Sequence, residues 1–434
     1  MMTKQQAYSI SAADLAARGR DQIPAELLSS TQLIYNSPAA LAFNSPGARG
    51  FGVKRAGLSI PGSVMLLIGP GCCGRNTTIL SAEGGYGDRF FFYVLDETDI
   101  VTGRHLYKIP RAVEEILDVL PQAPSAVVLC LTCVDALLGT DMERVCRKAE
   151  ARVHLPVVPC YMYALTREGR RPPMVAVRQM VYSLLKPQPR HRREANLLGF
   201  FSPLQDDCEL YGYLQQLGIQ TVREIGRCRT MEDYHQLSRA NFNLVLHPEA
   251  RLAAQDFEKN LHIPSIELTR IYETDRLSRQ YQALAQALGG TIDDRAEREA
   301  TEDLVRRVGQ RWHGTTVAVG EMLNGNAFEL ALTLARAGLT VKEIYGNVTP
   351  QDFVWIKALA ALAPETKIYC NLGPSMLYYD RSTGAADLTL GADAAWYHPH
   401  SVHVTWDEDV QPFGYAGTRA LFSALDRALS GRSS

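Results

Sequence analysis

The sequence predicts an α/β protein built from three Rossmann-like units, each with a parallel, doubly wound sheet. Short apolar runs alternate with amphipathic helical segments along most of the chain, as expected for a parallel sheet covered by helices. This alternation restarts after a proline-rich, charged linker at 186–193 and again after a helix-rich stretch at 270–311. The chain has 434 residues, which is too many for one ordinary hydrophobic core.

The chain opens with a predicted helical arm at 1–30, in which Ser11 is a suitable helix cap and Pro24 heads a second short turn. The first α/β domain is predicted at 31–192. Its predicted strands lie at 64–68, 90–94, 126–131 and 156–159, with helices at 110–120 and 140–151 between them.

Two further α/β domains are predicted at 193–312 and 313–434. The second has predicted strands at 196–201, 221–225 and 242–246 and a helix at 207–217. The third has predicted strands at 315–320, 341–345, 367–370 and 392–397, and a helix at 416–429 closes the chain.

Composition narrows the class of protein. The 45 basic and 47 acidic residues give a net charge of −2, so we expect no basic surface for nucleic acid. The start shows no signal peptide and no run reaches the ~20 apolar residues of a membrane span, so we expect a cytoplasmic protein with no membrane contact. Nine cysteines in that reducing compartment are expected to be thiols or metal ligands rather than disulfides.

Three cysteines follow predicted buried strands. The segment Gly69-Pro70-Gly71-Cys72-Cys73 ends one apolar run, and Cys133 ends another. The carboxyl ends of parallel strands meet at one sheet edge, where α/β proteins place their chemistry, and thiolates there favour a metal cluster. Cys130 is expected to point from its strand to the opposite face, into the core. The remaining cysteines have no partner at metal-ligand spacing and are expected to be structural: Cys146, Cys160, Cys208, Cys228 and Cys370.

Nucleotide chemistry by this chain is not expected. The segment 69–78 lacks the Gly-Lys-Ser/Thr ending of a phosphate loop, so ATP binding is not predicted. No Gly-x-Gly-x-x-Gly opens a helix after the first strand of a unit, which argues against a dinucleotide dehydrogenase. Electrons for any reduction would therefore come from elsewhere.

Three segments follow one another along the first predicted domain: Gly69-Pro70-Gly71-Cys72-Cys73, Glu97-Thr98-Asp99-Ile100-Val101-Thr102-Gly103, and Thr132-Cys133-Val134-Asp135-Ala136-Leu137-Leu138-Gly139-Thr140-Asp141. A shorter motif lies near the C-terminus, at Trp406-Asp407 and Gly414-Tyr415-Ala416-Gly417. In order and spacing the three segments resemble the large catalytic components of the nitrogenase family, and the C-terminal motif extends the resemblance over most of the chain. The resemblance implies a nitrogenase component 1-like fold and a cluster edge in the first domain.

The resemblance implies that Cys73 and Cys133 bind an iron–sulfur cluster. The family's upstream cysteine is absent, because Phe43 stands at that position, whereas Cys72 is one thiol more than the family's turn carries. Our interpretation is that Cys72 replaces the missing ligand, and the alternative is that Cys72 is a small packed residue. Adjacent cysteines can bind one cluster if the turn bends sharply, which Gly71 and Gly74 would permit through positive φ. Two chains would then supply six thiolates, suiting an eight-iron P-cluster-like group, or four without Cys72, suiting a 4Fe-4S cube.

The resemblance also implies a cleft that holds a substrate or a second metallocluster. The two residues that hold the large cofactor in nitrogenase are replaced here by His247 and Phe413, which argues against dinitrogen reduction on a molybdenum-type cofactor. His247 is either a metal ligand or a hydrogen-bonded residue at a strand end. Further cleft candidates are Glu249, Arg251 and the turn Glu321-Met322-Leu323-Asn324-Gly325-Asn326.

Three histidines fall within six residues near the C-terminus: His398, His400 and His403. With Asp407 and Asp409 they form either a proton relay or metal site, or a surface loop with incidental histidines. The sequence does not decide between these two interpretations.

The leading functional hypothesis is the electron-accepting, substrate-reducing component of a two-component nitrogenase-like reductase. It would pair with a second copy or a homologous chain, bridge an oxygen-sensitive iron–sulfur cluster, and receive electrons from a separate iron-protein-like ATPase to reduce a small-molecule substrate. The alternative is a scaffold that assembles or carries a metallocluster. A third hypothesis is a binding module without metal, which would be colourless.

Overall fold

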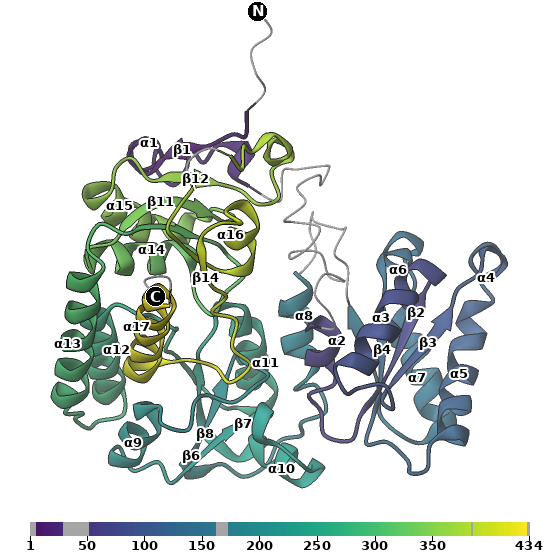
Figure 1. Ribbon diagram of the computed structural model, residues 1–434. Helices are drawn as coiled ribbons and strands as arrows, with labels where there is room; N and C mark the ends of the chain where they lie inside the picture. The colour runs from purple at the N-terminus through teal and green to yellow at the C-terminus, as the bar shows by residue number, and fades with distance from the viewer. Residues whose placement is uncertain (1–5, 29–51, 162–171, 383–384, 432–434) are drawn as a thin grey trace, which may run out of the picture. The chain divides into compact units, whose positions relative to one another are not determined.

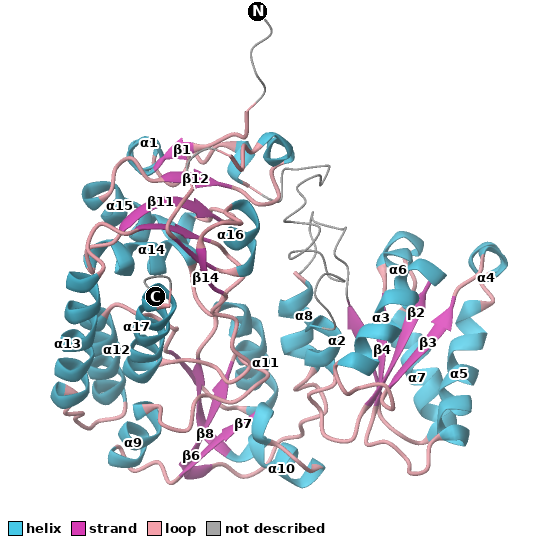
Figure 2. Ribbon diagram, in the orientation of Figure 1, coloured by secondary structure: helices cyan, strands magenta, loops and turns pink. Residues whose placement is uncertain are grey.

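The computed structural model describes residues 6–28, 52–161, 172–382 and 385–431. The chain forms two compact units, each assembled from separate stretches of sequence. Figures 1 and 2 show the helices and strands of both units. Unit 1 contains residues 1–45, 204–218 and 270–434, and unit 2 contains residues 46–203 and 219–269. The predicted domain limits at 30, 192 and 312 stay predictions.

Unit 2 contains two parallel four-stranded sheets. Sheet B has the strand order β3-β2-β4-β5 and sheet C the order β7-β6-β8-β9. The strands are β2 (Val64–Gly69), β3 (Phe90–Val94), β4 (Val127–Leu131), β5 (Val157–Tyr161), β6 (His191–Leu198), β7 (Thr221–Glu224), β8 (Ala240–Val245) and β9 (Ser265–Glu267). The helices are α2 (Gly52–Gly57), α3 (Gly71–Glu83), α4 (Glu97–Thr102), α5 (His105–Val119), α6 (Cys133–Leu138), α7 (Met142–Val153), α8 (Pro173–Met180), α10 (Met231–Gln236) and α11 (Arg251–Leu261), with the short 3-10 helix η6 (Pro248–Ala250).

Helices cover both faces of sheet B. Every residue of β2 is buried, and alternate residues join different cores: Met65 and Leu67 pack into one, and Leu66 and Ile68 into the other. This is the pattern of a parallel strand that is covered on both sides.

Unit 1 is built around sheet A, a six-stranded sheet with the order β1-β12-β11-β10-β13-β14. Its strands are β1 (Ile10–Ser11), β10 (Thr316–Val319), β11 (Thr340–Tyr345), β12 (Lys367–Tyr369), β13 (Leu388–Leu390) and β14 (Val402–Val404). Its helices are α1 (Ala12–Arg18), α9 (Glu209–Gln216), α12 (Thr274–Ala287), α13 (Arg295–Arg311), α14 (Ala327–Arg336), α15 (Phe353–Leu362), α16 (Ala392–Tyr397) and α17 (Gly414–Ser430), with the 3-10 helices η1 (Ala25–Leu27), η7 (Pro350–Asp352) and η8 (Pro374–Tyr378).

Sheet A is parallel except at one edge. There β1 pairs antiparallel with β12, with Ile10 opposite Ile368. The N-terminal segment therefore closes a sheet whose other strands lie between residues 316 and 404. The three parallel sheets confirm the predicted fold class, and no helix among the described residues is long and apolar enough to cross a bilayer.

Three local predictions were wrong. Residues 392–397 form helix α16 instead of a strand, because Gly391 with φ of 100° ends the preceding strand and the segment is rich in alanine. Strand β6 begins at His191, so the predicted linker is partly a strand. Helix α5 begins at His105 and contains Pro110, whereas the sequence predicts a helix that begins at this proline.

Candidate functional site

The cysteines lie where two neighbouring strands of sheet B end. Strands β2 and β4 pair directly, with Ile68 opposite Leu131, and each is followed at once by a helix. Cys73 lies in the first turn of α3, and Cys133 is the first residue of α6. The approach is close, because a Cβ on Gly69 would stand 2.7 Å from the Thr132 side chain and 3.3 Å from the Cys73 Cβ. The structure thus brings Cys73 next to the segment that carries Cys133.

Cys72 and Cys73 do not share one environment. Cys72 is exposed, whereas Cys73 and Cys133 are half-buried. Successive residues of a helix point about 100° apart, so the two adjacent thiols leave α3 in different directions. The expected sharp turn is absent, since neither Gly71 nor Gly74 has positive φ.

Gly74 has a different role from the one expected. A Cβ at this position would stand 2.0 Å from the Phe92 ring, so glycine lets α3 pack closely on β3. Phe43, which marks the missing upstream cysteine, lies outside the described residues.

Cys73 and Cys133 suit a sulfur-ligated cluster, because they are soft donors, follow two paired strands and are partly accessible. Within the described residues, however, no group of three or more His, Cys, Asp or Glu side chains is arranged to hold a metal ion. A cluster at this edge therefore needs ligands from a second chain or from outside the described ranges.

Large apolar side chains are exposed around the same edge. Val94 at the end of β3 is 55% exposed, Val101 on α4 is 84% exposed and Leu137 on α6 is 82% exposed. Figure 1 shows α4 and α6 at the arrowhead end of sheet B. Such an accumulation of exposed apolar groups is typical of an interaction surface.

The Glu97–Gly103 segment forms helix α4, and its Asp99 is structural. The Asp99 carboxylate is buried, pairs with Lys108 Nζ at 2.6 Å and accepts the Tyr93 hydroxyl at 2.8 Å. It therefore ties α4 to α5 and β3, which supports the cysteine edge.

Asp135 lies on the buried side of α6, two residues after Cys133. Its side chain is 1% exposed, and neither carboxylate oxygen has a hydrogen-bond partner among the described residues. Burial raises the pKa of Asp135 to about 6, although His105 opposes this effect. Sequence reasoning missed Asp135, since only the fold shows that this face of α6 is buried.

His247 and Glu249 follow β8 at the carboxyl edge of sheet C. The His247 Nδ1 lies 3.7 Å from the Glu249 carboxylate, and both side chains are half-buried. The sequence did not indicate Arg178, a buried guanidinium that donates to Glu249 at 2.7 Å and to the Gly199 carbonyl at 2.8 Å. Arg251 instead forms a surface ion pair with Glu267.

Glu321 lies at the carboxyl edge of sheet A, directly after the central strand β10. Its carboxylate accepts the Asn347 backbone N–H at 3.0 Å and the Asn371 side-chain amide at 3.2 Å. The buried Asp393 accepts the N–H groups of Glu321 at 2.8 Å and Met322 at 3.2 Å, and so fixes this turn. Burial raises the pKa of Asp393.

Three of these partners were missed, although each comes just after a strand: Asn347 follows β11, Asn371 follows β12 and Asp393 follows β13. Parallel strands on both sides of β10 deliver them to one edge, which is where open α/β sheets bind ligands. The edge is acidic and amide-rich.

The rest of the predicted turn is structural. The Asn324 side-chain oxygen accepts the Glu408 backbone N–H, and the Asn324 backbone N–H donates to the Trp406 carbonyl at 2.7 Å. Asn326 caps α14 by accepting the N–H groups of Phe328 and Glu329.

The three C-terminal histidines have separate surroundings. His398 is buried against Glu343, at 3.0 Å, whereas His400 is exposed. His403 is also exposed, and its Nδ1 lies 2.7 Å from the Thr389 hydroxyl. Asp407 and Asp409 are exposed as well.

Phe413 is buried and immediately precedes helix α17. Gly414 follows with φ of 63°, and a Cβ there would stand 1.9 Å from Glu209 Oε1. The Glu209 carboxylate accepts the first N–H groups of α17, from Tyr415 at 2.6 Å and Ala416 at 3.0 Å. The C-terminal motif is therefore the start of a core helix.

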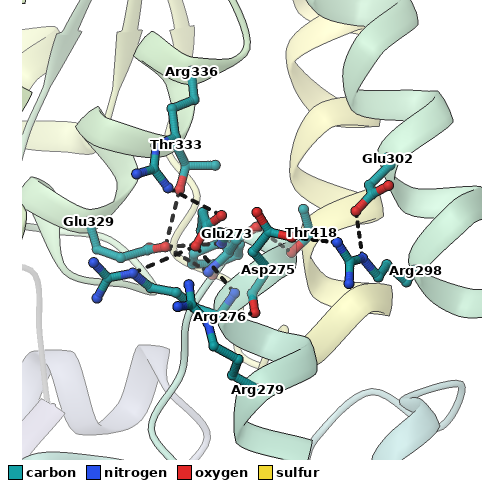
Figure 3. A network of polar contacts seen from close by, with 11 residues as sticks. Glu273, Asp275, Arg276, Arg279, Arg298, Glu302, Glu329, Thr333, Arg336 and Thr418 are labelled. Atoms are coloured by element: carbon teal, nitrogen blue, oxygen red, sulfur yellow. Dashed lines mark hydrogen bonds and ion pairs between the residues drawn. The ribbon is translucent and has the colours of Figure 1, made fainter. Parts of the chain in front are cut away.

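A second network in unit 1 joins α12 to α14 (Figure 3). Glu329 on α14 is fully buried and accepts the N–H groups of Tyr272 at 2.9 Å and Glu273 at 3.1 Å. Glu273 in turn pairs with Arg336 at 3.1 Å and Arg276 at 3.6 Å. Burial raises the pKa of Glu329 to about 7.

The cysteines that were expected to be structural are mostly buried. Cys130 packs in the core, as predicted, and Cys146, Cys160, Cys208 and Cys370 are also buried, whereas Cys228 is half-buried.

Comparison with known proteins identifies the family. The family model for nitrogenase component 1 type oxidoreductases matches residues 49–430. Among curated relatives, the nitrogenase iron-molybdenum cofactor biosynthesis protein NifE of Sinorhizobium fredii is 24% identical over 356 residues, 77% of this chain and 71% of the relative. NifE of Nostoc is 27% identical over 201 residues, 45% of this chain and 41% of the relative. NifE of Methanococcus maripaludis is 25% identical over 260 residues, 57% of this chain and 52% of the relative.

In these alignments the chain spans about half the length of the first curated relatives. Among solved structures, nitrogenase Cp1 at pH 6.5 superimposes with a TM-score of 0.71 at 18% identity, covering 96% of this chain and 97% of that chain. Nitrogenase Cp1 at pH 5 gives a TM-score of 0.63 at 15% identity, covering 92% and 91%. The structures establish the fold, and the family model spans nearly the whole sequence. The chain belongs to the nitrogenase component 1 type oxidoreductase family.

Proposed function

We propose that this chain is one subunit of a metallocluster assembly scaffold or carrier, in which the cluster is cargo. The observation that carries the proposal is that Cys73 and Cys133 follow paired strands at one sheet edge, while no group of three or more metal-ligating side chains lies there among the described residues. The names of the relatives support it, because NifE is called a cofactor biosynthesis protein. A carrier must bind a cluster and also release it. Release is easier where the protein supplies few ligands and the sheet edge is open.

A second chain completes the site in this proposal. The exposed Val94, Val101 and Leu137 around the cysteines provide the apolar surface for pairing with a second copy or a homologous chain. Two half-sites with Cys72, Cys73 and Cys133 would supply six thiolates, and two without Cys72 would supply four. Thiolate sulfur matches iron and neutralises the cluster's positive charge.

Each of the other two sheet edges is, by itself, a candidate for binding a precursor or a second metallocluster. At the edge of sheet C, His247 offers an imidazole, and the buried Arg178 holds the neighbouring Glu249 in place through an ion pair. At the edge of sheet A, Glu321 offers a carboxylate held in place by Asn347 and Asn371. These residues would orient a precursor or a second metallocluster.

The alternative is the substrate-reducing component of a two-component reductase in the cytoplasm, and membership of an oxidoreductase family favours it. Electrons would then come from a separate iron-protein-like ATPase, since the segment 69–78 lacks the lysine and hydroxyl of a phosphate loop. The same cysteines would accept those electrons.

One experiment separates the two functions. The chain is purified anaerobically with its partner, iron and acid-labile sulfide are counted, and the complex is mixed with a cluster-free nitrogenase acceptor. A scaffold should lose its visible absorbance stoichiometrically to the acceptor. A reductase should retain it and sustain turnover with reductant, ATP and the iron protein. Colourless, iron-free protein after careful anaerobic handling would overturn both.

A further inference from the structure

A buried cluster of phenols, carboxylate and imidazole lies beside sheet A. Glu343 on β11 is 8% exposed, and its carboxylate accepts the hydroxyl groups of Tyr345 and Tyr379, each at 2.6 Å. His398, which follows α16, places its Nε2 3.0 Å from the same carboxylate. Tyr369 lies at the margin, with its hydroxyl 3.5 Å from Glu343. These residues are the phenol–carboxylate cluster.

The hydrogen bonds around His398 and Glu343 show which of the two can take up a proton from a phenol. The Ala386 N–H donates to His398 Nδ1 at 3.3 Å, so in the neutral imidazole Nε2 carries the hydrogen and faces Glu343. Burial alone would raise the pKa of Glu343, but hydrogen bonds from His398, Tyr345 and Tyr379 outweigh it and lower the pKa. Glu343 is therefore an ionised base, at hydrogen-bond distance from two phenols that keep their protons.

A chain of aromatic rings connects this cluster to the surface. The rings of Tyr345 and Tyr397 stack with centroids 4.3 Å apart, and the Trp396 ring follows at 5.2 Å from Tyr397. Tyr345 and Tyr397 are fully buried, whereas Trp396 is partly exposed and lies under the Arg381 guanidinium at 4.2 Å. Electrons move readily between rings at such separations.

We propose that the phenol–carboxylate cluster is a redox-active tyrosine site that supplies electrons to oxygen-derived radicals at the protein surface. A phenol that loses an electron becomes a strong acid, so oxidation is easiest where a base is already in hydrogen-bond contact. Tyr345 meets this condition through Glu343, and Tyr397 and Trp396 provide its route to solvent.

The step balances as follows in electrons and protons. A hydroxyl radical takes one electron at Trp396 and, with one proton from solvent, becomes water. Tyr345 restores that electron by way of Tyr397, its O–H bond breaks, and the proton passes to Glu343. The products are a neutral Tyr345 phenoxyl radical and a protonated Glu343. A reduced iron–sulfur protein then returns one electron and is itself oxidised by one electron, and Glu343 returns the proton to Tyr345.

The test uses the full chain with photogenerated tris(bipyridine)ruthenium(III) as the oxidant and electron paramagnetic resonance of freeze-quenched samples as the readout. Wild type should give a tyrosyl radical that forms more slowly in D₂O. Tyr345→Phe and Glu343→Gln should both lose it. Trp396→Leu leaves the carboxylate unchanged and should slow the formation of the radical. This variant keeps the proposal testable if Glu343→Gln fails to fold.

The matched control is Tyr281→Phe. The Tyr281 hydroxyl also donates to a carboxylate, Glu209, at 2.6 Å, but its aromatic neighbours Tyr213 and Tyr415 are both buried. This variant should keep the wild-type signal. A radical that persists in Tyr345→Phe, or that disappears in Tyr281→Phe, would overturn the proposal.

Discussion

The Glu329 carboxylate accepts the backbone N–H of Tyr272 at 2.9 Å from a fully buried position, and so joins α14 to the start of α12. Burial raises the pKa of Glu329 to about 7 from the ordinary value of 4.5. The folded protein therefore binds this proton more tightly than the unfolded chain does. Stability from this group is fully present below about pH 4.5 and is lost as the pH rises through about 7.

Glu329→Gln should flatten this part of the pH dependence, because an amide resembles the protonated carboxyl. When the pH is lowered from 8 to 5, the free energy of unfolding of wild type should rise by on the order of 3 kcal/mol more than that of the variant. Urea unfolding at the two pH values measures it. Glu302→Gln, a change at a partly exposed glutamate, is the control, and equal slopes in both variants would contradict the assignment.

Substitution of the cysteines should rank them as ligands. Cys73→Ala and Cys133→Ala should lose most of the iron, because these residues occupy neighbouring strand ends. Cys72→Ala should lower the iron content or change the paramagnetic resonance spectrum. Cys130→Ala should do neither, since its thiol packs in the core. Iron analysis of anaerobic protein measures all four, and an unchanged Cys72→Ala protein would assign Cys72 to packing alone.

Pairing of two chains should depend on the apolar side chains around the cysteines. Leu137→Glu should weaken self-association or association with a homologous chain by about tenfold or more, because a charge would be buried at the interface. Sedimentation of anaerobic protein measures the dissociation constant. Val354→Glu is the control, since Val354 is 50% exposed on α15 in unit 1. If both variants weaken association equally, the cysteine edge is not the interface.

Gly414→Ala should destabilise unit 1 by about 2–4 kcal/mol, because positive φ and a collision with Glu209 both oppose a side chain there. Gly212→Ala is a suitable comparison, since a Cβ at that helical position meets nothing within 4 Å. It should be neutral or slightly stabilising. Thermal unfolding of the two proteins gives the difference.

The sequence predicted the strands well where apolar runs are short and bounded. Strand β3 was placed without error, and β2 differs by one residue. Residues 392–397 failed because alanines and aromatic residues fit either a helix or a buried strand, and the choice depends on Gly391 and the burial of Asp393.

Residues of the candidate site could be predicted only where a local sequence pattern marks them. Cys73, Cys133 and Glu321 each follow an apolar run and were found. Arg178 lies on a helix and reaches Glu249 across 71 residues, so no local pattern indicates it. His398 was noticed for its histidine neighbours, but its partner Glu343 is 55 residues away on another strand.

The discontinuous course of the chain sets the order in which its parts can be completed during synthesis. Unit 2, with the cysteines, is complete once residue 269 has emerged, whereas unit 1 must wait for the C-terminal strands. The Tyr8 N–H donates to Ser375 Oγ, 367 residues later, which at ~5–20 residues per second is a delay of roughly 20–70 s. A nascent chain would therefore present a finished cysteine edge while its N-terminal strand still has no sheet to join.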